Sequence, residues 1–315
     1  MKILHVGTFT SCPNAEWISL ALEAEGHNVT RVEESSVSAD EVIALSGGHD
    51  WILCEEGRLK HDHWSTKDGR NHIEGYFQKV LDNVNIPVVS WLTNIFMGIL
   101  PTREQEVKHN PIFKADIVFS TDGGHQKEFE AAGVKHVLLR QGIHEPEAYL
   151  ASGFDTKAEI GFIGSVYAHI WPYRKQLVEW LAKTYGERFE HFGQDGSIRH
   201  DALNKLCGTL KIVVGDSVKS PGYWSNRIYE ITGRGGFIIH PMTDGLAEEF
   251  TPYKHFIPYK FGDFASLKLI IDYYLSHPRE REEIRLAGFE HCRTAHTYQI
   301  RVKEMLKVLK ERGIV

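Results

Sequence analysis

The sequence predicts an α/β protein with two doubly wound domains, each a parallel sheet covered by helices on both faces. Three observations lead to this prediction. The chain has 315 residues, which suits one large domain or two of about 150 residues. Apolar runs of strand length alternate with helical patterns, as in successive βαβ units. Most of the strand-like runs are continuously apolar, as a sheet buried on both faces requires.

The start of the chain is predicted to form one complete βαβ unit. Lys2–Gly7 is a short strand that ends in glycine. Asn14–Gly26 carries apolar residues at helical spacing, with Gly26 as its C-cap, and His27–Glu33 is the next strand. A parallel pair of strands needs a crossover helix of this kind.

The same alternation continues through the first half of the chain and restarts after a linker. Residues 57–72 are polar and are predicted to be a loop, and the Pro-, Gly- and Ser-containing stretch 144–158 is the candidate linker. Further strands are predicted at 50–56, 86–92, 115–122, 134–142, 159–165, 188–195, 209–217, 236–241 and 255–261. Further helices are predicted at 73–84, 124–133, 171–186, 200–208, 225–235, 263–278, 279–295 and 298–313. We expect a first domain at 1–150, a second at 151–297, and a C-terminal helix, 298–315, that can return to the first domain.

The composition indicates an ordinary globular protein and excludes several classes. A formal charge of −6 gives no broad cationic field for nucleic acid or an anionic membrane. The four cysteines are scattered without a CxxC pair, as in reduced intracellular proteins. The amino-terminal apolar run is too short for a signal peptide, and no run approaches the roughly 20 apolar residues of a membrane span. We expect a cytoplasmic protein.

Familiar cofactor motifs are absent from the sequence. The first strand is followed by "GTFTSC" and the first strand of the second domain by "GFIGSVYAH", and neither completes G-x-G-x-x-G. The P-loop pattern is also missing, which disfavours dinucleotides and nucleoside triphosphate hydrolysis. His61 and His63 are close together, but no second cluster completes a ligand set, so no metal site is predicted.

Small and polar residues follow the predicted strands. In open parallel sheets, ligands bind outside the carboxyl ends of the strands, and two facing domains would enclose a cleft there. Turn residues are also common at strand ends, so this pattern has a structural explanation as well. The residues at these ends are Gly7, Thr8, Asn94, Thr121, Asp122, Gly164, Ser165, Asp216, Ser217 and His240.

The segment "NRIYEITGRGGFIIHP" is suited to a sugar nucleotide. Ser225 can cap a helix whose first turn offers N–H groups to a diphosphate, and Arg227 adds a forked donor. Glu230, one turn later, can accept hydrogen bonds from ribose hydroxyls, and Gly235 with Gly236 would permit close backbone approach. The alternative is an ordinary helix with a cap at each end and two solvated charges.

Several stretches resemble GT-B glycosyltransferases, in particular the CgeB-like group within the GT4-like set. They are "NRIYEITGRGGFIIHP", "GLAEEFTPYKHFIPY", "DYYLSHPREREEIRLAG" and "HTYQIRVKEML", together with "HVLLRQGIHEPEAY" and "EIGFIGSVYAHIWPYRKQL". The resemblance implies two Rossmann-like domains across a cleft, with the nucleotide-sugar donor held mostly by the second and the acceptor by the first. It also implies transfer without a metal ion and no cofactor beyond the donor itself.

The resemblance also implies roles for individual residues. Glu230 matches the family's ribose-binding glutamate, and Arg227 lies near the diphosphate. The resemblance also places Gly164 and Ser165 near the diphosphate. Arg174 and Lys175 could add positive charge there, although a solvated helix face is the commoner role of such a pair. The full set of predicted donor-binding residues is Gly164, Ser165, Arg174, Lys175, Ser225, Asn226, Arg227, Glu230, Gly235, Gly236 and His240. Gly222 departs from the pattern, because the family has an acidic residue there that faces the donor sugar. This departure leaves the donor sugar open and also permits a non-catalytic binding protein.

The predicted catalytic residues are Arg227, Glu230 and Asn94. Asn94 stands where the broader family often has His or Asp, and an amide cannot act as a general base. In a retaining transfer, the leaving diphosphate can accept the proton of the acceptor instead. His5, His125 and His240 are alternative proton-handling groups, each of which can equally be structural.

The acceptor remains open at this point. The predicted acceptor-side residues are Gly7, Thr8, His61, His63, Trp64 and Asn94. Gly7, Thr8 and Asn94 follow strands, and the loop with His61, His63 and Trp64 is included because aromatic rings stack on sugars. An ordinary exposed loop is the alternative for that segment. A saccharide, a small molecule or a protein is favoured as acceptor over nucleic acid. The prediction is a glycosyltransferase, with a sugar-nucleotide-binding or structural protein and a GT-B-like epimerase as alternatives.

Overall fold

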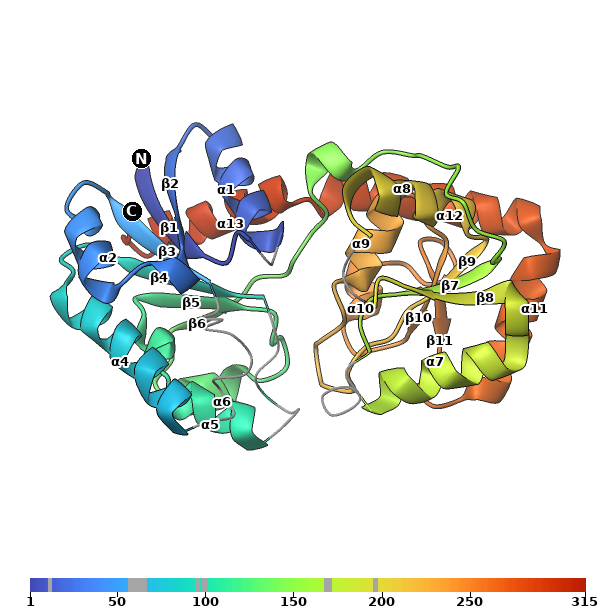
Figure 1. Ribbon diagram of the computed structural model, residues 1–315, viewed down its shortest axis with the longest axis horizontal. Coiled ribbons are helices and arrows are strands. Elements are labelled where there is room, and N and C mark those ends of the chain that lie inside the picture. The colour runs from blue at the N-terminus through green and yellow to red at the C-terminus, as the bar shows by residue number, and fades with distance from the viewer. Residues whose placement is uncertain (11–12, 56–66, 94–96, 98–100, 167–171, 195–197) are drawn as a thin grey trace. The chain divides into compact units, whose positions relative to one another are not determined.

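The computed structural model describes residues 1–10, 13–55, 67–93, 97, 101–166, 172–194 and 198–315 (Figure 1). The chain divides into two compact units. Unit 1 contains Met1–Gln141 and Tyr298–Val315, and unit 2 contains Gly142–Thr297. The first unit therefore ends at Gln141 rather than at residue 150, and residues 142–150 belong to the second.

Unit 1 is built on a parallel sheet with the order β2-β1-β3-β4-β5-β6 in the described part of the chain. Its strands are β1 (Lys2–Gly7), β2 (Asn28–Glu33), β3 (Trp51–Cys54), β4 (Val88–Leu92), β5 (Ile117–Ser120) and β6 (His136–Leu138). Every neighbouring pair runs parallel, from β1 beside β2 to β5 beside β6. The predicted doubly wound fold is confirmed for this unit.

Helices cover both faces of the unit 1 sheet, since successive strand side chains point to opposite faces. Ile3 packs with α1 (Pro13–Ala24) and α13 (Tyr298–Glu311), which lie side by side in Figure 1. Leu4 packs on the opposite face with four further helices. These are α2 (Ala39–Ser46), α4 (Lys67–Asn83), α5 (Pro101–His109) and α6 (Gln126–Ala131). The C-terminal helix is therefore part of unit 1.

Unit 2 repeats this design with a parallel sheet of order β11-β10-β9-β7-β8 among its described residues. Its strands are β7 (Ile160–Ile163), β8 (Phe189–Phe192), β9 (Ile212–Val214), β10 (Ile238–Pro241) and β11 (Ile257–Tyr259). One face is covered by α7 (Pro172–Tyr185) and α11 (Phe264–Ser276). The other is covered by α8 (His200–Thr209), α9 (Arg227–Gly233), α10 (Leu246–Glu249) and α12 (Pro278–Ala295). Short 3-10 helices are η1 (Glu34–Ser36), η2 (Pro111–Lys114), η3 (Glu145–Glu147) and η4 (Gly186–Arg188).

No helix in the described part of the chain is both long and apolar enough to cross a membrane.

Two helical glycines offer a test of the packing in this fold. A Cβ on Gly208 would lie 1.7 Å from the Ala151 carbonyl oxygen, whereas a Cβ on Gly75 would have no neighbour within 4 Å. Gly208→Ala should destabilise the protein by at least about 2 kcal/mol, because backbone must move. Gly75→Ala should stabilise it by about 0.5–1 kcal/mol through helix propensity alone. Urea unfolding checks both changes, and equal effects of the two substitutions would contradict the packing around α8.

Candidate donor site of unit 2

The carboxyl ends of β7 and β9 bring together the residues predicted to bind phosphate. The two strands are parallel neighbours, so the residues that follow them meet at one edge. The carbonyl oxygens of Ile163 and Ser165 accept hydrogen bonds from Arg227 Nε and Arg174 Nη1, both at 2.8 Å. His191 Nε2 lies 2.7 Å from the carbonyl oxygen of Gly164 between them. The loop after β7 is thus anchored to two arginines.

Asp216 joins these two arginines. Its Oδ2 accepts from Arg174 Nε at 2.7 Å, and its Oδ1 accepts from Arg227 Nη1. The Asp216 side chain is only 3% exposed, and the two arginine side chains are 11–14% exposed. With two guanidinium groups and one carboxylate, the cluster has an excess positive charge at the ligand-binding edge. We call Arg174, Asp216 and Arg227 the arginine cluster.

Arg227 is held in place but still has donor capacity. Its guanidinium carbon lies 4.8 Å from the centre of the Phe162 ring. No described residue accepts from its Nη2, which would lie 2.7 Å from a Cβ on Gly164. Burial lowers the pKa of Arg227 to about 10 against the opposing attraction of Asp216, so the side chain is cationic at neutral pH. Gly164, with a φ of +126°, leaves the space beside this nitrogen open.

The helix that carries Arg227 and Glu230 differs from the prediction. It begins at Arg227 and has only 7 residues, with Asn226 as an N-cap that makes no side-chain capping bond. Asn226 already has helical backbone angles, and the Ser225 Oγ accepts from the Arg227 N–H at 3.3 Å, which is the bond expected of a capping serine. Because so short a helix has a weak dipole, charged side chains are left as the main attraction for an anion.

Glu230 lies one turn after Arg227 on the same face of α9. Its Oε2 accepts from Arg234 Nη1 at 2.5 Å, and no described residue donates to Oε1. The side chain is 15% exposed. Burial raises the pKa of this carboxyl, Arg234 lowers it, and the charge of Glu147 raises it further. One oxygen of Glu230 is therefore fixed and the other is left for a ligand.

Two predicted donor residues, Gly235 and Gly236, are not at this edge, and a third, Lys175, has an ion-pair partner of its own. Gly235 and Gly236 precede β10, so they lie at the amino end of the sheet, opposite the arginine cluster. Added Cβ atoms there would meet Leu150 at 2.3 Å and Ile231 at 2.5 Å, which makes these glycines packing residues. Lys175 is 53% exposed and pairs with Glu179 on α7 at 3.6 Å. The expectation that Gly235 and Gly236 admit a ligand is wrong, because the protein's own side chains fill that space.

His240 lies in the interior of unit 2 and is not exposed at the edge with the arginine cluster. It is fully buried on β10, its Nδ1 lies 2.9 Å from the Pro241 carbonyl oxygen, and its ring packs against Gly215. Burial lowers its pKa to about 4, so the imidazole is neutral at neutral pH. The side chain therefore supports the loop that carries Asp216.

The buried imidazole of His240 predicts acid sensitivity. Because its folded pKa is about 4 and its ordinary value 6.5, stability is full above pH 6.5 and falls as the pH drops toward 4. The loss should amount to about 2–3 kcal/mol. His240→Phe should reduce this loss, whereas replacement of the exposed His109 by glutamine should not. Urea unfolding from pH 7 to pH 4 measures this loss of stability. A loss in His240→Phe as large as in the wild-type protein would contradict the prediction.

The predicted acceptor-side residues lie in unit 1 and are only partly described. Gly7 is the last residue of β1, and the buried Thr8 follows it. Beside them, the buried His5 has its Nε2 3.2 Å from Glu55 Oε1 and its Nδ1 2.7 Å from Ser19 Oγ. His61, His63, Trp64 and Asn94 lie outside the described residues. The acceptor side therefore stays a prediction.

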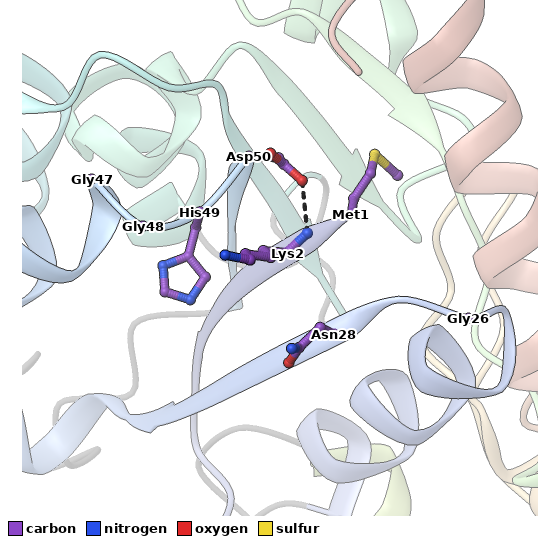
Figure 2. Close-up of a pocket in the computed structure, with 8 residues that line it drawn as sticks. All are labelled: Met1, Lys2, Gly26, Asn28, Gly47, Gly48, His49 and Asp50. Carbon is purple, nitrogen blue, oxygen red and sulfur yellow. Dashed lines mark hydrogen bonds between the residues drawn. The ribbon is translucent and has the colours of Figure 1, made fainter.

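A surface hollow of about 580 Å³ lies elsewhere in unit 1 (Figure 2). It is lined by the starts of β1, β2 and β3, which is the amino edge of the sheet. The Lys2 N–H donates to Asp50 Oδ2 at 2.7 Å, and both His49 nitrogens contact the protein's own oxygens. Its polar groups are occupied locally and it lies opposite the ligand-binding edge, so we assign no site to it.

Sequence reasoning missed three members of the site. Asp216 was identified as a strand-end residue but not as the partner of two arginines. Arg234 stands four residues after Glu230, a spacing that pairs opposite charges on a helix and could have identified it. Charge spacing on a helix does not identify Glu147, because it lies in the stretch 144–158 that the sequence predicts to be a linker.

Comparisons with known proteins agree with this architecture. Residues 174–307 match the family model described as "Glycosyl transferase-like", a range that contains the arginine cluster and Glu230. None of the curated proteins matches the chain. HepE from Anabaena, solved with UDP and glucose, aligns over 99% of this chain and 100% of its own, with 12% identity and a TM-score of 0.64. The chain has the GT-B fold.

Other solved structures share the GT-B fold at similar identity. Sucrose-phosphate synthase from Thermosynechococcus elongatus is 13% identical, with 99% of each chain covered and a TM-score of 0.63. A glycosyltransferase from Rickettsia africae is 13% identical, with 98% of each chain covered and a TM-score of 0.60. The predicted fold class is confirmed, while the closer likeness to the CgeB-like and GT4-like groups stays a prediction.

Proposed function

We propose that this protein is a glycosyltransferase that moves a hexosyl or pentosyl group from a nucleoside diphosphate sugar to an acceptor, with retention of configuration. The observation that carries the proposal is the arginine cluster, with Glu230 one helical turn away. A diphosphate needs multiple cationic donors, and a ribose needs an acceptor a short distance further on. The match to a glycosyl transferase-like family model over the same residues supports this assignment.

In the proposed complex, unit 2 binds the donor. Arg227 Nη2 donates to a phosphate oxygen in the space beside Gly164, and Arg174 contributes a second positive charge. Glu230 Oε1 accepts from the ribose hydroxyls, while Oε2 stays with Arg234. The related HepE structure contains UDP, which makes UDP sugars the first donors to test.

The reaction needs few protein groups. The bond between the anomeric carbon and the diphosphate oxygen breaks, and a new bond forms between that carbon and the acceptor oxygen on the same face. The acceptor proton passes to the leaving diphosphate, so no protein base is required. Arg174 and Arg227 stabilise the charge that develops on the leaving group. We propose that they take the place of a metal ion, so that turnover persists in EDTA.

The acceptor is proposed to bind to unit 1 and to be a saccharide, a small molecule or a protein rather than a nucleic acid. The first strand ends there at Gly7, beside the buried His5 and Glu55 pair, and Thr8 follows it. We place the reaction in the cytoplasm, where nucleotide sugars are available as free substrates.

A ligand screen tests the proposed function. UDP, GDP, ADP, CMP and dTDP are compared by thermal shift, and the matching nucleotide sugars are then assayed for release of the nucleotide. We expect one diphosphate to raise the melting temperature and its sugar to be turned over faster with acceptor. Stabilisation without turnover would favour a sugar-nucleotide-binding protein, and turnover independent of any acceptor would favour an epimerase. If none of the five nucleotides raised the melting temperature, the proposal would be contradicted.

The binding-protein alternative has one specific observation in its favour. Gly222 stands where the resembling family has an acidic residue, and its φ of +59° favours glycine. A carboxylate at this position would require a different local backbone, so the donor sugar must be recognised by other groups.

A further inference from the structure

Arg234 connects two acidic side chains inside unit 2. Its Nη1 lies 2.5 Å from Glu230 Oε2, and its Nη2 donates to Glu147 Oε2. The Arg234 side chain is 1% exposed and that of Glu147 is 10% exposed. Two carboxylates thus share one guanidinium group in the interior.

Glu147 is itself held from several sides. His200 Nδ1 lies 2.8 Å from its Oε1, and the Asn204 amide donates to its carbonyl oxygen at 2.8 Å. Asn204 also donates to the Tyr149 carbonyl oxygen at 2.9 Å, which fixes the backbone after η3. The resulting chain of contacts runs from His200 through Glu147 and Arg234 to Glu230, and it reaches the proposed ribose site from the interior.

The stability of the fold does not account for this arrangement. Buried ion pairs are often no more stabilising than apolar side chains of similar size, and a second carboxylate adds an uncompensated charge. What these contacts do provide is a fixed orientation of the Glu230 carboxylate. Arg234 fixes Oε2, so that Oε1 keeps one direction and can accept hydrogen bonds from a ligand.

We propose that Arg234 and Glu147 are positioning residues that aim Glu230 at the ribose hydroxyls and thereby set a preference for ribonucleotides. This inference rests on the proposed function. A carboxylate that is correctly oriented discriminates strongly between a hydroxyl and its absence, because a buried acceptor without a donor is costly. Without its contact to Arg234, the Glu230 carboxylate would rotate, and the preference for a ligand with ribose hydroxyls would be lost.

The test compares UDP with 2′,3′-dideoxy-UDP by calorimetry. The wild-type protein should bind UDP about 10–100-fold more tightly. Arg234→Gln should bring this ratio close to 1 while the affinity for the dideoxy ligand stays within about 3-fold, and Arg234→Lys should restore part of the ratio. Arg188→Gln, which removes another ion-paired arginine of unit 2, is the control and should leave the ratio intact.

The outcomes separate this inference from the function on which it rests. Failure of the wild-type protein to bind any of the five screened nucleotides would overturn both. UDP binding with an unchanged ratio in Arg234→Gln would overturn the positioning role alone, because a purely structural arginine would weaken both ligands equally.

Glu147→Gln gives a second readout if Arg234→Gln does not fold. The charged and titratable groups around Glu230 are Arg234 and Glu147, with Cys207 facing Arg234 and His200 facing Glu147. Removal of the Glu147 charge lowers the pKa of Glu230, so the preference for UDP should persist to a lower pH than in the wild-type protein. An identical pH profile in the variant would overturn the inference.

Discussion

Replacement of Arg227 by methionine is expected to weaken the binding of UDP by about 100-fold. Arg227 supplies the donor beside Gly164 and half of the positive charge of the arginine cluster. Charge-assisted hydrogen bonds contribute about 1.5–3 kcal/mol each, which corresponds to a loss of this size. Arg227→Lys should fall between methionine and the wild type, because it keeps the charge but loses the fork. Isothermal titration calorimetry measures the UDP affinities of the wild-type protein and the two variants.

The fold should survive Arg227→Met. Asp216 would keep Arg174 as a partner, so no buried charge is left alone. Arg188→Met is the matched control. Arg188 immediately precedes β8, at the amino edge of the same sheet, and it pairs with Glu159. Equal UDP affinities in Arg227→Met and Arg188→Met would show that the diphosphate does not bind at the arginine cluster.

Replacement of Glu230 by alanine is expected to cost about 10–100-fold in UDP affinity, through loss of the hydrogen bonds from the ribose. Glu230→Ala should not unfold the protein, because Arg234 would then pair with Glu147 alone in a balanced ion pair. Binding of 2′,3′-dideoxy-UDP should change little. The exposed Glu290 on α12, replaced by alanine, is the control. If Glu230→Ala weakened both ligands equally, the carboxylate would have no contact with ribose.

Much of the fold could be predicted from local patterns. Continuous apolar strands such as Trp51–Cys54 and Val88–Leu92, with amphipathic helices between them, indicate a parallel sheet with two covered faces. The sequence patterns did not predict the helices α2 and α5. The first has only 8 residues and is recognisable mainly by the capping box of Ser38 and Glu41. The second, "PTREQEVKH", has almost no apolar face.

The candidate site was predicted in part because strand ends and helix spacing are local features. Gly164, Arg227 and Glu230 follow from their positions along the chain, whereas a solvated helix face was the favoured role of Arg174. The role of Asp216 depends on β7 and β9 being neighbours in the sheet, although β8 lies between them in the sequence. The role of Glu147 depends on a contact across 87 residues of sequence. Contacts of this kind come from tertiary packing and leave no periodic signal.

We propose that the arginine residues, rather than a helix terminus, are the main attraction for the anion. The sequence suggested a capped helix whose dipole faces a diphosphate, but α9 has only 7 residues, and so short a helix has a weak dipole. The arginine cluster supplies the charge instead and holds it in a defined geometry through Asp216.

A crystal structure of the protein soaked with UDP tests the central claim most directly. We expect the phosphates to contact the guanidinium groups of Arg174 and Arg227, and the ribose hydroxyls to donate to Glu230 Oε1. Density for UDP at any other place on unit 2, or a ribose that makes no contact with Glu230, would contradict the account.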